Sequence, residues 1–157
     1  MNHDRSIAKS SSVPVHYFYL ITIFFLCLTG FAQMPVFKRY YIADVPGLGW
    51  LAQFYTTHYM HYLAAILLIA LFAYMVVEYF ALDRKGRKIT KSAYVRGIAL
   101  AGIVVTGVLL VIRNLAGIRF SPGFIIFIDL SHLGLVMTFL MVALYSLIFK
   151  KRWTSAR

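Results

Sequence analysis

Cysteine is almost absent from this sequence, since Cys27 is the single one among 157 residues. A lone cysteine excludes an internal disulfide, a cysteine-bound iron–sulfur cluster and a Cys-x-x-Cys-His haem attachment. Charged side chains are also scarce, at 13% of the chain against about 25% in an average soluble domain. No Ser–His–Asp set, phosphate-binding loop or glycine-rich dinucleotide fingerprint occurs. The sequence therefore offers no group-transfer active site.

Hydrophobic residues take the place of the missing charge. They make up 61% of the chain, and the mean hydropathy is +0.77. A soluble globule of this length cannot hide so much apolar side chain, because small domains leave much of their surface exposed. The net charge of +11 lies mainly beside apolar runs, which favours lipid headgroups and topology signals over nucleic acid. We therefore expect an integral membrane protein in contact with the lipid bilayer, with no nucleic-acid partner.

Four apolar runs are long enough to cross a bilayer, which takes about 20 residues in a helix. The connectors between them are short and contain turn signals such as Pro46-Gly47. Pro122 is placed to occupy the first turn of the last helix. The sequence predicts an all-α, integral membrane four-helix bundle that forms one domain, residues 1–157. The predicted spans cover about 13–36, 49–80, 93–112 and 122–149.

Basic residues are unevenly divided between the two sides of these spans. Twelve belong to the two terminal tails and the region 81–96, and four belong to the other side. Lysine and arginine accumulate on the cytoplasmic side of membrane proteins. We therefore expect both termini in the cytoplasm and a multi-pass protein of the cell inner (cytoplasmic) membrane. The twelve are Arg5, Lys9, Arg84, Lys85, Arg87, Lys88, Lys91, Arg96, Lys150, Lys151, Arg152 and Arg157, and the four are Lys38, Arg39, Arg113 and Arg119.

Four histidines fall within the predicted spans, where an ionisable or ligating side chain is costly and needs a reason. They are His16, His58, His61 and His132. Imidazole is a common metal ligand, and two imidazoles from different helices at one depth suit a haem iron. At 1.5 Å per residue, His61 lies roughly 18 Å and His132 roughly 15 Å below the outer start of its span. The matching depths make His61 and His132 the candidate axial ligands of a haem b.

The other two histidines are assigned different roles. His58 lies one turn from His61 near the same helix face, so the two cannot bind one iron from the same side. His58 is the second choice as ligand, and otherwise a hydrogen-bond partner of a haem propionate or a bound quinone. His16 lies near the cytoplasmic end of its span with no other histidine at its depth, which favours an interfacial or quinone-adjacent position. For each histidine, a hydrogen bond between helices is the alternative.

Further polar residues have two interpretations each. Thr29-Gly30 and Thr106-Gly107 lie in the outer parts of the first and third spans, where small residues allow close approach of another helix or of a flat cofactor. Asp129, one turn before His132, either orients an imidazole or lies at the outer interface. Arg113 is placed to meet haem propionates or a partner protein.

Several short pieces of the sequence together match a known pattern. They are His16 followed by Thr29-Gly30 in the first span, His61 followed by Ala65 in the second, Thr106-Gly107-Val108-Leu109-Leu110 in the third and His132-Leu133-Gly134 in the fourth. The chain resembles the four-helix b-type cytochrome subunits that anchor formate dehydrogenases (the gamma subunit) and nickel–iron hydrogenases in the membrane. The resemblance implies that the second-span and fourth-span histidines bind an outer haem.

One position departs from that family. Members with two haems carry a second fourth-span histidine roughly fourteen residues, or nearly four turns, after the first, which puts both on one helix face. Here that position is Ser146, whose hydroxyl is not a usual haem ligand. The resemblance therefore supports the haem between His61 and His132. We expect one haem b, with a second left open.

The expected function is that of a b-type cytochrome membrane subunit that relays electrons between a partner redox subunit and the quinone pool. The partner is expected to be an iron–sulfur or multihaem subunit, because this chain has nothing that oxidises a soluble substrate. The chain would itself be a non-catalytic part of an oxidoreductase complex, with quinone as an exchangeable substrate. Two alternatives stay open. One is a haem-free membrane anchor or assembly subunit, and the other is a small proton-conducting transporter unit with His16, His58 and Glu78 as relay groups.

Overall fold

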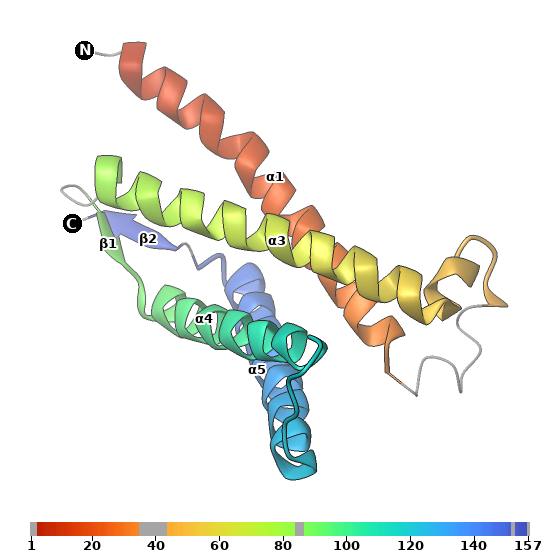
Figure 1. The fold of residues 1–157 in the computed structure, drawn as a ribbon. Helices are drawn as coiled ribbons and strands as arrows, with labels where there is room; N and C mark the ends of the chain where they lie inside the picture. Colours follow the sequence, from red (N-terminus) through yellow and green to blue (C-terminus); the bar gives the residue numbers. More distant parts are fainter. Residues whose placement is uncertain (1–2, 35–43, 84–86, 152, 157) are drawn as a thin grey trace. The chain divides into compact units, whose positions relative to one another are not determined.

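The computed structural model describes residues 3–34, 44–83, 87–151 and 153–156. Its four long helices are α1 His3–Ala32, α3 Phe54–Glu78, α4 Lys91–Ile112 and α5 Pro122–Ile148 (Figure 1). The short elements are the 3-10 helix η2 Gly49–Ala52, the π-helical turn η3 Tyr79–Asp83, and the strands β1 Arg87–Ile89 and β2 Thr154–Ala156. The predicted all-α class is confirmed. All four long helices contain a stretch that is long and apolar enough to cross a membrane, which is the make-up of a multi-pass membrane protein.

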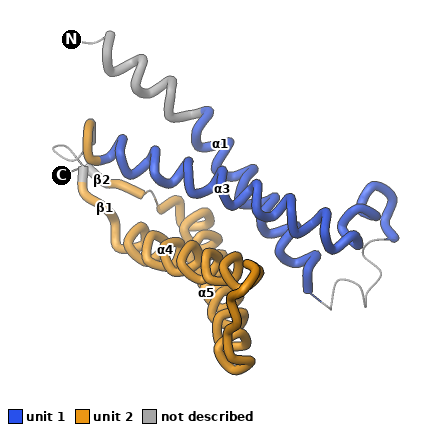
Figure 2. Tube along the Cα trace, viewed as in Figure 1, with its two compact units in different colours: residues 1–79 blue, residues 80–157 orange. Residues whose placement is uncertain are grey.

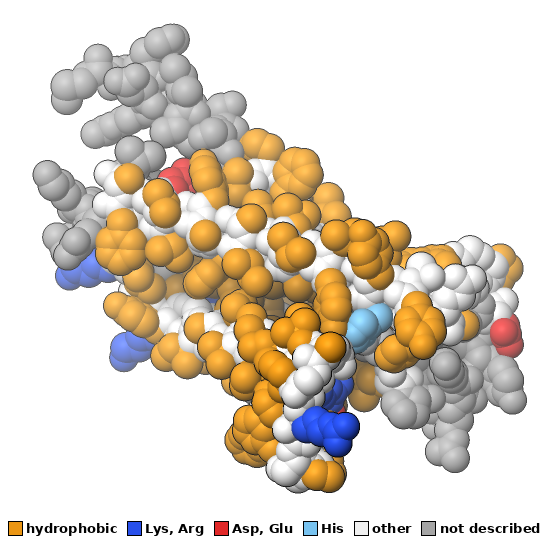
Figure 3. All heavy atoms as spheres, viewed as in Figure 1, with side chains coloured by type: hydrophobic (Ala, Val, Ile, Leu, Met, Phe, Trp, Pro, Cys, Tyr) orange, Lys and Arg blue, Asp and Glu red, His pale blue; other side chains and the backbone are white. Residues whose placement is uncertain are grey.

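Large apolar side chains point outward from these helices. Phe24, Ile98 and Met141 expose 68%, 72% and 68% of their surface. On the face drawn in Figure 3, apolar side chains cover most of the described surface. Water would penalise this exposure, whereas lipid chains solvate it, so the surface fits a bilayer as its surroundings.

The chain divides into two compact units, unit 1 with residues 1–79 and unit 2 with residues 80–157 (Figure 2). Each unit pairs two long helices, α1 with α3 and α4 with α5. In unit 1, Thr29 contacts His61 while Gln33 contacts His58, so residue numbers rise on one helix as they fall on the other. The contacts of unit 2 follow the same order, so both pairs are antiparallel. The end at which the two helices of a unit are joined is termed its hairpin end, and the other its open end.

The first helix ends earlier than the sequence predicted. It stops at Ala32, where Gln33 and Met34 donate backbone hydrogen bonds to carbonyls only three residues back. Met34 precedes a proline, and the residue before a proline is disfavoured in the α conformation. The last two residues of the predicted span, 35–36, lie outside the described residues. At its start, the membrane-spanning stretch of α1 begins at Pro14, close to the predicted residue.

The second predicted span, 49–80, starts too early. Its first residues form the separate helix η2, and the extended backbone of Gln53 (φ −81°, ψ 98°) divides η2 from α3. Leu51 of η2 is buried against Ala32 at the end of α1. This apolar contact folds the segment onto the hairpin end of unit 1 instead of extending α3.

The helices of unit 2 begin at side-chain caps. The Thr90 hydroxyl accepts a hydrogen bond from the Ala93 amide (3.2 Å) at the start of α4. The Ser121 hydroxyl accepts one from the Phe124 amide (3.4 Å) at the start of α5. Such caps satisfy amides that have no partner inside the helix. The predicted place of Pro122 in the first turn is confirmed.

A small antiparallel ribbon, which the sequence did not predict, joins β1 to β2 at the open end of unit 2. Lys88 pairs with Ser155 at its centre. The Thr90 amide donates to the Trp153 carbonyl (3.1 Å), and the guanidinium of the buried Arg96 lies 4.0 Å from the centre of the Trp153 ring. The ribbon therefore ties the segment after α5 to the start of α4.

Candidate functional site

His61 of α3 meets Thr29 of α1 inside unit 1. Its Nδ1 lies 3.0 Å from the Thr29 Oγ1. Thr29 is fully buried, and its hydroxyl also donates to the Phe25 carbonyl of its own helix (2.8 Å). The half-buried imidazole of His61 is therefore anchored to α1 through its Nδ1 atom.

Unit 2 repeats this contact with different residues. The Nδ1 of His132 in α5 lies 2.9 Å from the Thr106 Oγ1 in α4. The Thr106 hydroxyl also donates to the Gly102 carbonyl one turn earlier (2.8 Å). The two histidines that the sequence indicates as axial ligands thus have the same kind of partner, each within its own unit.

The hydrogen bonds of the threonines fix the tautomer of both imidazoles. A hydroxyl has one proton and two lone pairs. Since Thr29 and Thr106 give that proton to a backbone carbonyl, their oxygens accept from the neighbouring imidazole. Nδ1 therefore carries the proton, and the lone pair of each neutral ring is on Nε2. This is the form in which histidine binds a metal through Nε2.

The glycine that follows each threonine makes room for the ring. A Cβ atom on Gly30 would lie 3.3 Å from Cε1 of His61, and one on Gly107 would lie 3.4 Å from Cε1 of His132. The first distance is tighter than ordinary van der Waals contact, and the second is at its lower limit. From the sequence, these Thr-Gly pairs could approach either another helix or a flat cofactor. In the structure, each pair lies next to the imidazole of the neighbouring helix.

His58 belongs to a second polar group beside the first. Its Nδ1 lies 2.8 Å from the Gln33 Oε1, and the Gln33 amide nitrogen donates to the Thr29 carbonyl (3.2 Å). The His58 ring stacks on Phe54, with centroids 5.3 Å apart and planes 18° apart. His58 and His61 therefore have different partners, although they lie one turn apart. Sequence analysis missed Gln33, which a search for polar residues one turn from Thr29 would have found.

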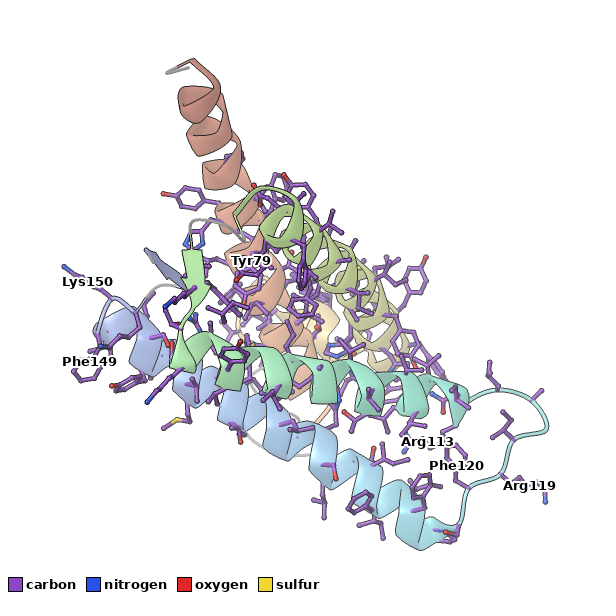
Figure 4. All side chains as sticks on the ribbon, turned by 90° about the vertical axis from the view of Figure 1, so that its left-hand side faces the viewer. Tyr79, Arg113, Arg119, Phe120, Phe149 and Lys150 are labelled. Atoms are coloured by element: carbon purple, nitrogen blue, oxygen red, sulfur yellow. The ribbon has the colours of Figure 1, made fainter. Side chains whose placement is uncertain are left out.

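Asp129 pairs with Arg113 at the hairpin end of unit 2. Nη1 of the arginine lies 3.1 and 3.0 Å from the two carboxylate oxygens. The side chains are 28% and 49% exposed, respectively for arginine and aspartate, which favours an interfacial position for Asp129. In Figure 4, Arg113 lies with Phe120 and Arg119 at this end, and Lys150 lies at the other end of α5.

His16 stands apart from the contact between Thr29 and His61. It precedes Thr29 by 13 residues of α1, which is about 20 Å along the helix. Its side chain is exposed, and its ring meets the edge of the Tyr17 ring at a centroid distance of 6.2 Å. His16 therefore takes no part in the contact between Thr29 and His61, and its interfacial role stays a prediction.

Ser146 lies in a buried polar cluster at the open end of unit 2. It is 3% exposed and donates to the Ser92 hydroxyl (3.4 Å). Nη2 of Arg96 lies 3.4 Å from the same hydroxyl, and Nε of Arg96 donates to the Ser92 carbonyl (3.3 Å). Two hydroxyls and a guanidinium therefore lie together around Ser146 at this level of unit 2.

Comparison of the chain with protein-family models, with curated proteins and with solved structures gives no match. Among the described residues of either unit, no three His, Cys, Asp or Glu side chains are grouped so that they could hold a metal ion.

Proposed function

We propose that the chain is a b-type cytochrome subunit of a membrane redox complex, in which His61 and His132 bind one haem iron. One observation carries this proposal. Each unit, taken by itself, contains an imidazole whose Nδ1 lies 3.0 or 2.9 Å from a threonine hydroxyl, so that the ring would bind a metal through Nε2. A haem iron with two imidazole ligands needs two such nitrogens.

The surroundings of both rings suit this cofactor. Metal-ligating histidines almost always donate their other N–H to a nearby acceptor, and the two threonine oxygens provide that acceptor here. When bound, haem supplies the one-electron redox couple of its iron. Each threonine holds its imidazole within its own unit, and the apolar helices supply surroundings of low dielectric constant. His58 and Gln33, one turn toward the hairpin end, are placed to meet a propionate or a quinone.

The proposed role is electron relay between a partner redox subunit, of the iron–sulfur or multihaem kind, and the quinone pool. The chain has no group-transfer motif, so the substrate chemistry would belong to the partner. One haem b per chain is proposed, because Ser146 donates to Ser92 at the position where two-haem relatives have a ligand. In this proposal the protein would lie in the cell inner membrane, with a quinone as its exchangeable substrate.

Both open ends are proposed to face the cytoplasm, from the division of twelve basic residues against four. Reporter fusions after Lys88 and after Arg157 should read as cytoplasmic, and a fusion at Pro46 should read as external. A cytoplasmic signal at Pro46 would contradict this orientation.

The test of the haem proposal is a reduced-minus-oxidised visible spectrum and a pyridine haemochrome assay of the purified full-length protein. We expect a low-spin b-type spectrum and one haem per polypeptide. His61→Ala and His132→Ala should each lose the haem or convert it to high spin, because an iron–nitrogen bond is removed. His58→Ala and His16→Ala are the matched controls and should keep the low-spin spectrum. A parent protein without haem would refute the proposal, and two haems per chain would refute the proposed number.

A haem-free membrane anchor is the second candidate function, and the same contacts favour it. The bonds from Thr29 to His61 and from Thr106 to His132 join the two helices of each unit, as interhelical hydrogen bonds do in membranes. In that case the parent protein would show no haem spectrum. Both histidine variants would then lower the melting temperature with no spectral change.

A further inference from the structure

We infer that Thr29 and Thr106 are positioning residues that set the haem reduction potential through the hydrogen bonds they accept from the two axial imidazoles. The inference rests on the proposed function and deepens it. It assigns a role to two residues that would not touch the haem iron and that act through His61 and His132.

The orientation of each imidazole ring depends on more than its bond to the threonine. A single bond to Nδ1 would let an imidazole swing about that contact. Here each ring also lies close to the neighbouring backbone, because a Cβ atom added to Gly30 would lie 3.3 Å from Cε1 of His61 and one added to Gly107 would lie 3.4 Å from Cε1 of His132. The bond to the threonine and the small space beside the glycine together limit the direction of Nε2.

The threonine hydroxyls also determine the charge of the two imidazole ligands. Thr29 and Thr106 present neutral hydroxyl oxygens, which accept a hydrogen bond but cannot remove the Nδ1 proton as a base would. Both ligands therefore stay neutral imidazoles whose basicity is raised by the hydrogen bond to the threonine. A more basic ligand stabilises the oxidised iron more than the reduced iron. Removing the acceptor should therefore raise the reduced fraction at a fixed potential.

Thr29 and Thr106 differ from other threonines of the helices by their contact with an imidazole. Thr22, Thr57 and Thr138 also donate to the carbonyl four residues earlier, at 2.7, 3.0 and 2.8 Å. That bond is a common feature of threonine in helices and does not mark a site. Thr29 and Thr106 add to it an imidazole at 3.0 and 2.9 Å.

Thr22 provides a matched control for Thr29. Both are buried in α1 and lie seven residues, nearly two turns, apart, which places them on one side of the helix. Replacing either by valine removes a hydroxyl of the same kind from the same helix and keeps the shape of the side chain. In unit 2, Thr138→Val serves as the control for Thr106→Val.

The experiment is a spectroelectrochemical titration of the full-length protein and these variants. Thr29→Val and Thr106→Val should each raise the ratio of reduced to oxidised haem at a fixed potential by roughly three- to tenfold, as expected for the loss of one hydrogen bond. A tenfold change corresponds to about 59 mV for a one-electron couple. Thr29→Ser and Thr106→Ser keep the hydroxyl and should restore the parent ratio. Thr22→Val and Thr138→Val should leave it unchanged.

The outcomes separate the inference from the proposed function. Loss of haem from the valine variants, with retention in the serine variants and in Thr22→Val, would support a positioning role through orientation. An unchanged ratio in Thr29→Val and Thr106→Val, or an equal shift in Thr22→Val, would overturn the inference and leave the cytochrome proposal standing. A parent protein without haem would overturn the proposed function itself.

Discussion

Units 1 and 2 share one contact and differ around it. Each has a threonine that holds an imidazole from the antiparallel helix, followed by a glycine that makes room for the ring. Three residues before that histidine, toward the hairpin end, unit 1 has His58 and unit 2 has Asp129. The shared contact is internal to each hairpin, whereas the neighbouring position differs in charge and in partner. The feature that both units share is therefore the Thr-Gly pair next to the imidazole, Thr29-Gly30 in unit 1 and Thr106-Gly107 in unit 2.

The partners at this neighbouring position show what the difference means. His58 and Gln33 form a half-buried neutral pair, and Gln33 is also bonded to the Thr29 backbone. Asp129 and Arg113 form a more exposed ion pair, which links the residue that follows α4 to α5. In unit 1, Gln33 therefore connects His58 at the hairpin end to Thr29, which contacts His61. The hairpin end of unit 2 has the partly exposed ion pair of Arg113 and Asp129 instead.

The largest effect on the shared contact is expected from Gly30→Val and Gly107→Val. Even a single Cβ would lie 3.3 or 3.4 Å from an imidazole carbon, so valine must push the ring away. Overpacking of this kind costs about 1–3 kcal/mol, or several degrees of melting temperature. We expect both variants to melt earlier in detergent. Gly97→Val and Gly134→Val, where a Cβ meets open space, should not. If all four variants melted at the same temperature, Gly30 and Gly107 would have no special role beside the imidazoles.

A smaller effect is expected from Gln33→Leu, which tests the feature special to unit 1. The change removes the acceptor that His58 Nδ1 uses and a donor to the Thr29 carbonyl. The loss of a half-buried hydrogen-bonding group costs about 1–2 kcal/mol. Thermal unfolding in detergent should show it. Gln53→Leu is the control, since Gln53 is exposed, and a drop as large in that variant would contradict the network.

At the open end of unit 2, Trp153→Ala should loosen the ribbon. The change removes the ring on which Arg96 lies, a contact that contributes about 1 kcal/mol. Limited trypsin digestion should then cleave faster at the exposed Lys150 and Lys151, which lie just before the ribbon's second strand. Trp153→Phe keeps a ring and should behave like the parent. If Trp153→Ala is cleaved no faster, the contact does not hold the segment.

The smallest effect is expected from the ion pair at the hairpin end of unit 2. Arg113→Ala, Asp129→Ala and the double variant form a double-mutant cycle. Partly exposed pairs contribute about 0.2–1 kcal/mol, so the coupling energy should fall in this range. The coupling energy is obtained from the melting temperatures, in detergent, of the parent, the two single variants and the double variant. A coupling above about 2 kcal/mol would mean that the pair is as integral to unit 2 as Gln33 is to unit 1.

The helices could be predicted from the sequence because composition alone reports them. Runs of about 20 apolar residues have few alternatives in a membrane, and Pro122 marks a helix start by its fixed backbone angle. Residues 49–53 were placed wrongly in the second span because Leu51 is as apolar as a span residue. Its burial against Ala32 depends on a fold that hydropathy does not contain. The β1–β2 ribbon was missed for the same reason, since three-residue strands leave no periodic pattern.

The candidate site was predicted only by residue type and depth. The sequence singled out His61 and His132 and both Thr-Gly pairs, but it did not connect them. Which side chain faces which helix depends on helix rotation and on the length of the loop between the two helices. These cannot be read from a uniformly apolar segment. The assignment of iron ligands stays a prediction, and the structure adds the tautomer that each ring has.

The repeated contact does not depend on the length of the connecting segment. Thr29 and His61 are 32 positions apart and Thr106 and His132 are 26 apart, so the connecting segments differ while the contact is the same. Each hairpin holds its own imidazole through residues of its own two helices. Changes in the loop of one unit, or at the position three residues before its histidine, can therefore leave the contact in the other unit intact.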